Sequence, residues 1–158
     1  KTISQKQFQA LPGKNLKGVV LDLRNNPGGY LQGAVDIASE FLSKGSLVVV
    51  EDRGGVKKEF RTLRQGILTQ TPVVILINGG SASASEILAG ALRDNLGLKL
   101  VGEETFGKGT IQEPQELEGG SGLHVTIARW LTPKGTWVND KSLEPDVKIE
   151  DDAKTTED

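Results

Sequence analysis

Two short apolar segments of the sequence each end in a turn that contains glycines. The segments GVVLDLR (18–24) and PVVILIN (72–78) have the length and apolar character of buried strands. NNPGG follows the first segment and Gly79-Gly80 follows the second, and clusters of this kind stop a strand. PVVILIN is the more apolar of the two, which predicts a central place for it in a sheet.

An amphipathic helix is predicted after each of these two turns. The stretch from Leu31 to Leu42 carries apolar residues at helical spacing, and Gly45 is placed where a helix C-cap belongs. A second helix is predicted to begin near Ser83. Further strands are predicted at 46–51, 57–63, 98–101, 110–117 and 122–131, the first two pairing across Gly54-Gly55. In a chain of 158 residues, this order predicts one α/β or α+β domain without internal repeats.

Composition excludes several classes of function. Cysteine is absent, which excludes disulfides and a thiolate nucleophile, and His124 is the only histidine, which argues against a zinc site. Aromatic residues make up 4% and the net charge is −2, so no basic, aromatic nucleic-acid surface is expected. No apolar run is long enough to predict a membrane span. The first residue is Lys1 and not Met, so a processed or excised piece of a longer protein is expected.

The segment richest in candidate chemistry is INGGSASASEILAGALRD (77–94). A buried strand, a Gly-Gly turn and a helix follow one another there, which is the layout that places a nucleophile at a helix N-terminus. Ser81, Ser83 and Ser85 are all candidates. The spacing of Ser83 and Glu86 also fits a capping box, in which the hydroxyl only caps the helix. The residues alone leave both capping and catalysis open for Ser83.

Lys108 lies between two glycines in the segment GEETFGKGTIQ (102–112). This segment misses the phosphate-loop pattern, because Gly109 stands where Ser or Thr is required and Pro114 interrupts the helix that should follow. Nucleotide binding is therefore rejected. Lys108 is either a solvated lysine in a turn or a base held in an apolar pocket beside Phe106 without an acid partner.

Two other catalytic arrangements have weaker support in the sequence. A Ser–His–Asp triad would have to use His124, which lies in the alternating strand 122–131 and is more typical of a structural histidine. A pair of catalytic carboxylates stays open, although no pair of acids stands out beside glycines. Asp22 and Arg24 are predicted to form an internal ion pair or to support the turn.

Four motifs occur along most of the chain, from about Lys17 to Asp146. They are DLRNNPGG (22–29), INGGSASASEILAGALRD (77–94), VGEETFGKGTIQ (101–112) and RWLTPKGTW (129–137). Together and in this order they resemble the motifs of the C-terminal processing peptidases, also called tail-specific proteases. The resemblance implies a ClpP/crotonase-like β/α spiral, which agrees with the strand and helix order expected from the pattern.

The resemblance also implies a serine endopeptidase with a Ser–Lys dyad that needs no cofactor and no metal. The serine followed by Ala-Ser-Glu is the nucleophile in this family and falls on Ser83, and the lysine of F-G-K-G is the general base and falls on Lys108. Gln112, four residues beyond that lysine, is implied to orient it. The implied oxyanion donors are the backbone N–H groups of Ala84 and of Gly28 or Gly29.

Expectations for the whole protein follow from the same resemblance. Residues 17–149 are expected to be the protease core, residues 1–16 a partial N-terminal segment, and residues 150–158 an acidic tail. A PDZ module is expected in the full-length chain but is absent from this sequence. The expected partner is a protein or peptide substrate recognised by its C-terminal tail, with no nucleic acid, and a homo-oligomer is compatible with the family. The expected location is secreted or in the cell envelope, periplasmic or membrane-anchored.

Two other functions fit the same core. One is a non-catalytic peptide-binding core, and the other is an acyl-CoA hydratase or hydrolase that uses the same oxyanion turns. Lys108 with Gln112 argues against the second, because acyl-CoA enzymes typically rely on acids at that place. Cleavage of an unfolded protein, compared between the wild type and Ser83→Ala, separates a peptidase from a binding core.

Overall fold

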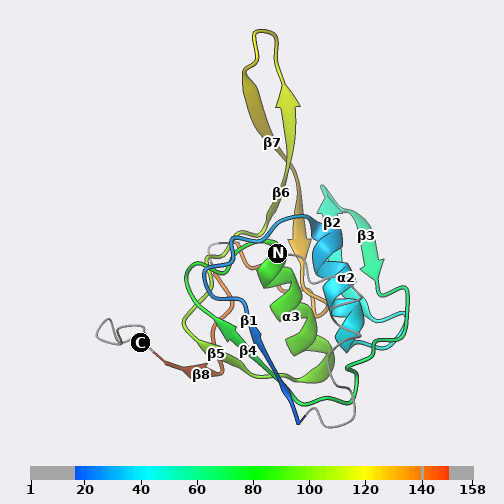
Figure 1. The fold of residues 1–158 in the computed structure, drawn as a ribbon. Coiled ribbons are helices and arrows are strands. Elements are labelled where there is room, and N and C mark those ends of the chain that lie inside the picture. The colour runs from blue at the N-terminus through cyan, green and yellow to red at the C-terminus, as the bar shows by residue number, and fades with distance from the viewer. Residues whose placement is uncertain (1–16, 140, 150–158) are drawn as a thin grey trace.

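The computed structural model describes residues 17–139 and 141–149, so the expected N-terminal segment 1–16 and acidic tail 150–158 lie outside the described residues. In chain order the elements are β1 (Val19–Asp22), α2 (Leu31–Phe41), β2 (Leu47–Arg53), β3 (Val56–Arg61), β4 (Val73–Ile77), α3 (Ala84–Leu96), β5 (Leu100–Gly102), β6 (Thr110–Glu116), β7 (Gly122–Leu131) and β8 (Val147–Lys148). Figure 1 shows α2 and α3 side by side in the body of the molecule, with strands on both sides of them. The mixed α/β class expected from the sequence is confirmed.

The first sheet is parallel and has the order β1-β4-β5-β8. β4 lies between β1 and β5, with Val19 opposite Val73 and Ile75 opposite Leu100. Ile75 and Ile77 are fully buried, so the most apolar segment of the sequence is a central strand, as predicted. The sequence pattern did not predict β8, because two exposed residues are too few to show an alternation.

The second sheet is antiparallel and has the order β3-β2-β7-β6. The predicted hairpin of β2 and β3 is confirmed, with Arg53 opposite Val56 across the Gly54-Gly55 turn. β2 also pairs with the C-terminal part of β7, where Asp52 lies opposite Arg129. The sheet thereby connects the β2–β3 hairpin with the segment that follows Lys108 in the chain.

One contiguous core joins both helices and both sheets. Its fully buried members include Phe41 of α2, Leu92 of α3, Ile75 of β4 and Trp130 of β7. Burial of such large side chains supplies the main driving force for folding a chain of this size. Neither helix of the described residues has the length and apolar content needed to cross a membrane.

The predicted end of the first helix is wrong. α2 ends at Phe41, and its C-cap Leu42 is extended with φ −107° and ψ 156°, while the Leu42 N–H donates to the Ala38 carbonyl. Gly45 has φ +83° and belongs to the turn that leads into β2, where its N–H donates to Thr62 O at 2.9 Å. A glycine that serves a turn and a glycine that caps a helix both have positive φ, so the sequence does not separate them.

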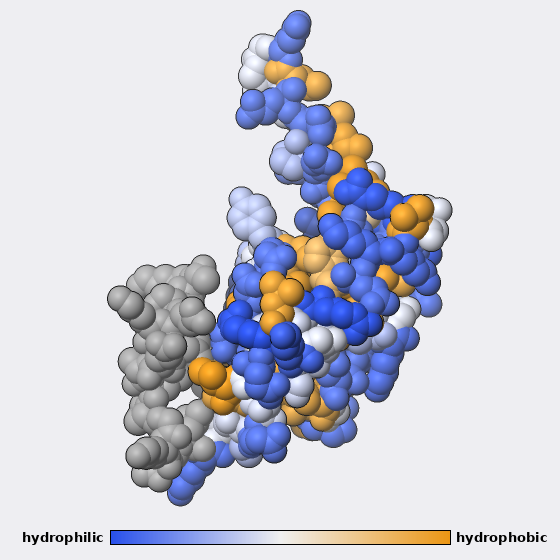
Figure 2. Space-filling model, turned by 90° about the vertical axis from the view of Figure 1, so that its right-hand side faces the viewer, coloured by the Kyte–Doolittle hydropathy of each residue, from blue (hydrophilic) through white to orange (hydrophobic). Residues whose placement is uncertain are grey.

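β6 and β7 form a two-stranded ribbon that projects from the body of the molecule (Figure 1). The strand predicted at 122–131 is present, but its outer part does not rest on the core, since Leu123 is 52% and Val125 37% exposed. Figure 2 shows hydrophobic side chains along the ribbon among hydrophilic ones. The alternation of apolar and polar residues therefore predicted the strand but not its exposure.

Candidate active site

The turns that follow β1 and β4 lie side by side and are joined by asparagine side chains. Asn78 Oδ1 accepts hydrogen bonds from the backbone N–H groups of Asn25 at 2.9 Å and Gly80 at 3.0 Å, and Asn78 Nδ2 donates to Asn25 Oδ1 at 3.0 Å. A Cβ atom on Gly80 would lie 2.8 Å from Asn25 Cα, so only glycine fits there. The carboxyl ends of two neighbouring parallel strands, where α/β proteins commonly bind ligands, are thereby fixed to each other.

Two of the three candidate serines have structural partners. Ser81 is fully buried, and its hydroxyl donates to Leu23 O at 2.7 Å. Ser85 is 4% exposed, and its hydroxyl donates to Asn26 O at 3.0 Å. Both bonds connect the start of α3 with the turn after β1. Ser83, which is half-buried, is the serine best placed for chemistry.

Ser83 is the N-cap residue of α3 and has an unusual backbone conformation. Its φ of +54° and ψ of −115° are rare for a residue other than glycine, and strain of this kind concentrates at functional sites. A strained serine between a buried strand and a helix N-terminus has the form of a nucleophile elbow. The capping interaction is present as well, because the Ser83 N–H donates to Glu86 Oε2 at 2.8 Å. This bond uses the backbone of Ser83, and in the other half of the capping box the Ser83 side chain faces the backbone N–H of Glu86.

The glycine turn after β1 packs against Ser83. A Cβ atom on Gly28 would lie 2.7 Å from Ala84 N and 3.0 Å from Ser83 Cβ, and Gly28 has φ +94°, so both space and conformation require glycine. The Gly28 N–H donates to Asn26 Oδ1 at 3.0 Å. Within the described residues, the N–H groups of Gly29 and Ala84 have no hydrogen-bond partner.

The buried carboxylate of Glu86 joins Ser83 to the loop that carries Lys108. Glu86 is 0% exposed. Its Oε1 accepts from Thr105 Oγ1 at 2.6 Å and from the Gly107 N–H at 2.8 Å. Its Oε2 accepts from the N–H groups of Ser83 at 2.8 Å and Lys108 at 2.9 Å. The sequence indicated Glu86 only as a capping residue, because local spacing cannot show a contact across 22 residues.

The opposite side of this loop, residues 105–109 (the Lys108 loop), is held by two tryptophans. Trp130 Nε1 donates to Lys108 O, and Trp137 Nε1 donates to Gly109 O, each at 2.9 Å. Both tryptophans belong to the motif RWLTPKGTW, which the sequence singled out without assigning a role to it. The Lys108 loop is therefore bound through both its N–H and its C=O groups.

The side chains near Lys108 are placed only partly as expected. Lys108 is half-buried, and within the described residues its ammonium group makes no hydrogen bond or ion pair. Phe106 is 67% exposed, so the apolar pocket expected beside it does not form. Gln112 is exposed on β6 and makes no side-chain hydrogen bond to Lys108 in the described part of the chain. His124 is exposed on the ribbon, which gives no support to a triad with Ser83.

Asp22 and Arg24 form the ion pair that the sequence predicts. Arg24 Nη2 lies 2.8 Å from Asp22 Oδ2, and the Arg24 backbone N–H donates to Asp22 Oδ1 at 3.0 Å. The side-chain hydrogen bond from Arg24 lowers the pKa of Asp22 below its usual value. Both side chains are about half exposed, so the pair supports the turn after β1. Among the described residues, no group of three or more His, Cys, Asp or Glu could hold a metal ion.

Comparison with known proteins gives close matches to one group of peptidases. The family model of peptidase family S41 matches residues 3–149. The carboxy-terminal processing protease CtpA of Bacillus subtilis is 42% identical over 144 residues, which are 90% of this chain and 31% of that protein. The chloroplastic C-terminal processing peptidase of Tetradesmus obliquus is 40% identical over 154 residues, 98% of this chain and 33% of that protein. The chain thus spans about a third of the length of these relatives.

Solved structures have the same fold. The photosystem II D1 C-terminal processing protease matches with a TM-score of 0.82 and 41% identity, over 92% of this chain and 38% of that one. The tricorn protease matches with a TM-score of 0.59 and 21% identity, over 92% of this chain and 14% of that one, which is a likeness of fold alone. These likenesses agree with the expected ClpP/crotonase-like core. From the family model and the identities to its relatives, the chain belongs to peptidase family S41.

Proposed function

We propose that this chain is the catalytic core of a serine endopeptidase of the C-terminal processing type, with Ser83 as nucleophile and Lys108 as general base. The observation that carries the proposal is the strained Ser83 at the start of α3, joined through Glu86 to the backbone of Lys108. Membership of family S41 supports a serine-type peptidase. The names of the relatives support a substrate that is a protein with a C-terminal tail.

Acyl transfer is the proposed reaction. Neutral Lys108 accepts the proton of the Ser83 hydroxyl while the serine oxygen attacks a peptide carbonyl, and the lysinium then protonates the leaving amine. Water hydrolyses the acyl-enzyme with Lys108 again as the base. The hydrogen bonds of Glu86 favour both steps, because they fix the backbones of Ser83 and Lys108 relative to each other.

The oxyanion of the tetrahedral intermediate is proposed to accept hydrogen bonds from the N–H groups of Ala84 and Gly29. The sequence left the choice between Gly28 and Gly29 open. The Gly28 N–H is already bonded to Asn26 Oδ1, whereas the Gly29 N–H has no partner in the described residues. Gly28 is proposed to allow the close approach of the turn to Ala84, and Gly29 to donate.

Gln112 is proposed to orient the Lys108 side chain when substrate is bound. Its place four residues after Lys108, near the start of β6, supports this role. An amide is suited to it, because its oxygen accepts a hydrogen bond without adding a negative charge that would favour lysinium. Catalytic hydrogen bonds often tighten only in the substrate complex, so the absence of the bond here is compatible with the role.

The organisation of the full-length protein is a separate part of the proposal. Residues 17–149 are proposed as the protease core, 1–16 as part of an N-terminal segment and 150–158 as an acidic tail. A PDZ module elsewhere in the full-length protein and a homo-oligomer are proposed from the resemblance to the family. The proposed location is the cell envelope or the exterior, and fractionation of the source cells followed by immunodetection would test it.

A cleavage assay on a tagged, unfolded protein tests the dyad, in this chain and in the full-length protein. Ser83→Ala and Lys108→Ala should abolish cleavage and retain the fold, because each removes one member of the dyad. Ser121→Ala at the tip of the ribbon and Lys134→Ala on the surface are matched controls and should cleave normally. Cleavage by Ser83→Ala would refute the proposal. Binding without cleavage by the wild type would favour a non-catalytic peptide-binding core.

A further inference from the structure

We propose that Trp130 and Trp137 are positioning residues that hold the Lys108 loop through their indole N–H groups. They are the only two tryptophans of the chain. Their Nε1 atoms donate to consecutive carbonyl groups, those of Lys108 and Gly109, at 2.9 Å each. The inference rests on the function proposed above, in which Lys108 is the general base.

The Lys108 loop needs anchors outside itself, because glycines flank the lysine. Gly107 has φ +83°, and a Cβ atom on Gly109 would lie 2.6 Å from Trp137 Nε1. Glycines give a backbone more accessible conformations than other residues, so the sequence of the loop does little to fix Lys108. Glu86 binds the N–H groups of Gly107 and Lys108, and the tryptophans bind the next two carbonyls. The peptide groups around Lys108 are thus held from both sides.

Trp130 ties this loop to the core. It is 1% exposed, and its backbone N–H also donates to Gly109 O, at 3.1 Å. Trp130 lies in β7 opposite Glu51 of β2. The position of the Lys108 carbonyl therefore depends on the pairing of β7 with β2 and not only on the loop itself.

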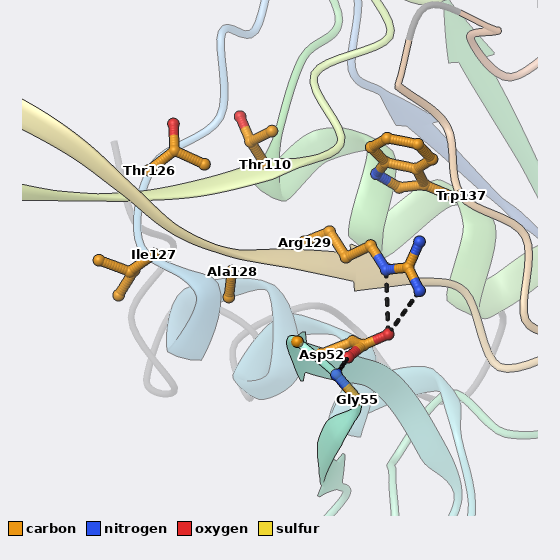
Figure 3. A pocket seen from close by; sticks show the side chains of 9 residues that line it. Asp52, Gly55, Thr110, Thr126, Ile127, Ala128, Arg129 and Trp137 are labelled. Carbon is orange, nitrogen blue, oxygen red and sulfur yellow. Dashed lines mark hydrogen bonds and ion pairs between the residues drawn. The ribbon is translucent and has the colours of Figure 1, made fainter.

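Trp137 ties the loop to an ion pair in an open pocket at the base of the ribbon. The pocket has a volume of about 440 Å³ and is lined by residues that include Asp52, Arg129 and Trp137. Figure 3 shows the Arg129 guanidinium beside the Trp137 ring and pointing toward Asp52. Its Cζ lies 5.5 Å from the centre of that ring, and its Nε and Nη2 donate to Asp52 Oδ2 at 2.9 and 2.7 Å. The ion pair therefore supports the ring whose N–H binds Gly109.

Trp137→Phe is a sharper test than Trp130→Phe, because Trp137 is 39% exposed and Trp130 only 1%, so the change disturbs the core less. The phenylalanine keeps an aromatic ring and removes the indole N–H. Per folded molecule, we expect kcat to fall about 10-fold with KM changed less than about twofold, because the loss affects the placement of the base and not substrate binding. Trp130→Phe should act in the same direction.

Phe41→Leu is the matched control. Phe41 is a buried aromatic residue of α2, and no hydrogen bond in the described part of the chain joins it to the Lys108 loop. This substitution should lower stability and leave kcat and KM per folded molecule unchanged. A wild-type kcat in both tryptophan variants would overturn the inference. So would a loss of activity that only follows the folded fraction, as in Phe41→Leu.

An NMR measurement on the indole groups separates this inference from the proposed function. The two indole N–H resonances, assigned from the Phe variants, should exchange slowly with solvent, because both groups are hydrogen-bonded. Rapid exchange of both would overturn the inference whatever the activity. A wild type that neither cleaves an unfolded protein nor is acylated at Ser83 would refute the proposed function, and slow exchange would then show only that the indoles hold the loop.

Discussion

Replacing Glu86 by glutamine should weaken the connection between Ser83 and the Lys108 loop without changing the size of the side chain. Oε1 of Glu86 faces two donors, Thr105 Oγ1 and the Gly107 N–H, and Oε2 faces two more, the N–H groups of Ser83 and Lys108. A glutamine amide has only one acceptor atom. Its NH2 group must therefore face one of these two pairs of donors, whichever way the amide is turned.

The less costly orientation places the NH2 group at the position of Oε1. The hydroxyl of Thr105 can rotate and accept from it there, although Thr105 Oγ1 already accepts from the Leu143 N–H at 2.7 Å. The Gly107 N–H and the Thr105 hydroxyl hydrogen then both lose their acceptor. A buried unsatisfied donor costs about 1–3 kcal/mol, so the two donors cost about 2–6 kcal/mol, and loss of the charge from the remaining bonds adds about 1 kcal/mol. The expected decrease in the free energy of unfolding is therefore about 3–7 kcal/mol.

Urea denaturation measures this decrease, and the rate at which a fluorophosphonate phosphonylates Ser83, with loss of fluoride, measures its effect on the site. We expect phosphonylation per folded molecule to slow more than about 10-fold, because the nucleophile and the base lose their common anchor. Glu40→Gln is the matched control, since Glu40 is a buried carboxylate of α2 that pairs with Arg64. Wild-type stability and a wild-type phosphonylation rate in Glu86→Gln would refute the reasoning.

Three further predictions concern other parts of the molecule. Gly28→Ala should abolish cleavage, because a Cβ there would lie 2.7 Å from a backbone nitrogen and φ is +94°. Gln112→Ala should lower kcat by about 10²-fold, and Gln112→Glu should move the pH optimum up by about one unit; superimposable pH–rate curves would remove Gln112 from the site. The side-chain hydrogen bond from Arg129 lowers the pKa of Asp52 in the folded protein. The stabilisation that ionised Asp52 gives the fold is therefore complete above its unfolded-state pKa of about 4, and it is lost as pH falls through the folded-state pKa. Asp52→Asn should therefore flatten the dependence of the unfolding free energy on acid pH. Urea denaturation at a series of acid pH values measures this dependence, and the same dependence in wild type and variant would contradict the prediction.

Local pattern was enough to predict most of the fold. The central strand was predictable because a short apolar run bounded by turns is typical of a strand buried on both faces. Ile75 and Ile77 are indeed fully buried. The end of α2 was not, because Gly45 serves the next turn and Leu42 is already extended. The exposure of Leu123 was not predictable either, since alternation reports the conformation of a strand and not what covers its faces.

The candidate site was less accessible to sequence reasoning, because its organisation depends on contacts between distant residues. The residues alone leave Ser81, Ser83 and Ser85 open as nucleophiles, and they are separated by the partners of the first and last on the turn after β1 and by the strained backbone of Ser83. The contact between Trp130 and Lys108 spans 22 residues and has no local signal. What the sequence did carry was the S-x-x-E spacing at Ser83, although it suggested only half of the role that Glu86 has.

The start of α3 shows how capping and catalysis can coexist at one serine. Glu86 satisfies the Ser83 N–H, as a capping box requires, and with the same oxygen it binds the Lys108 N–H. The next N–H along the helix, that of Ala84, has no protein partner in the described residues, and the first N–H groups of a helix have no intrahelical one. Such a donor beside a strained serine suits a transient oxyanion, which needs an N–H that no other protein group occupies. Capping through Glu86 and the proposed donation by Ala84 therefore use two different N–H groups of the same helix start, so neither excludes the other.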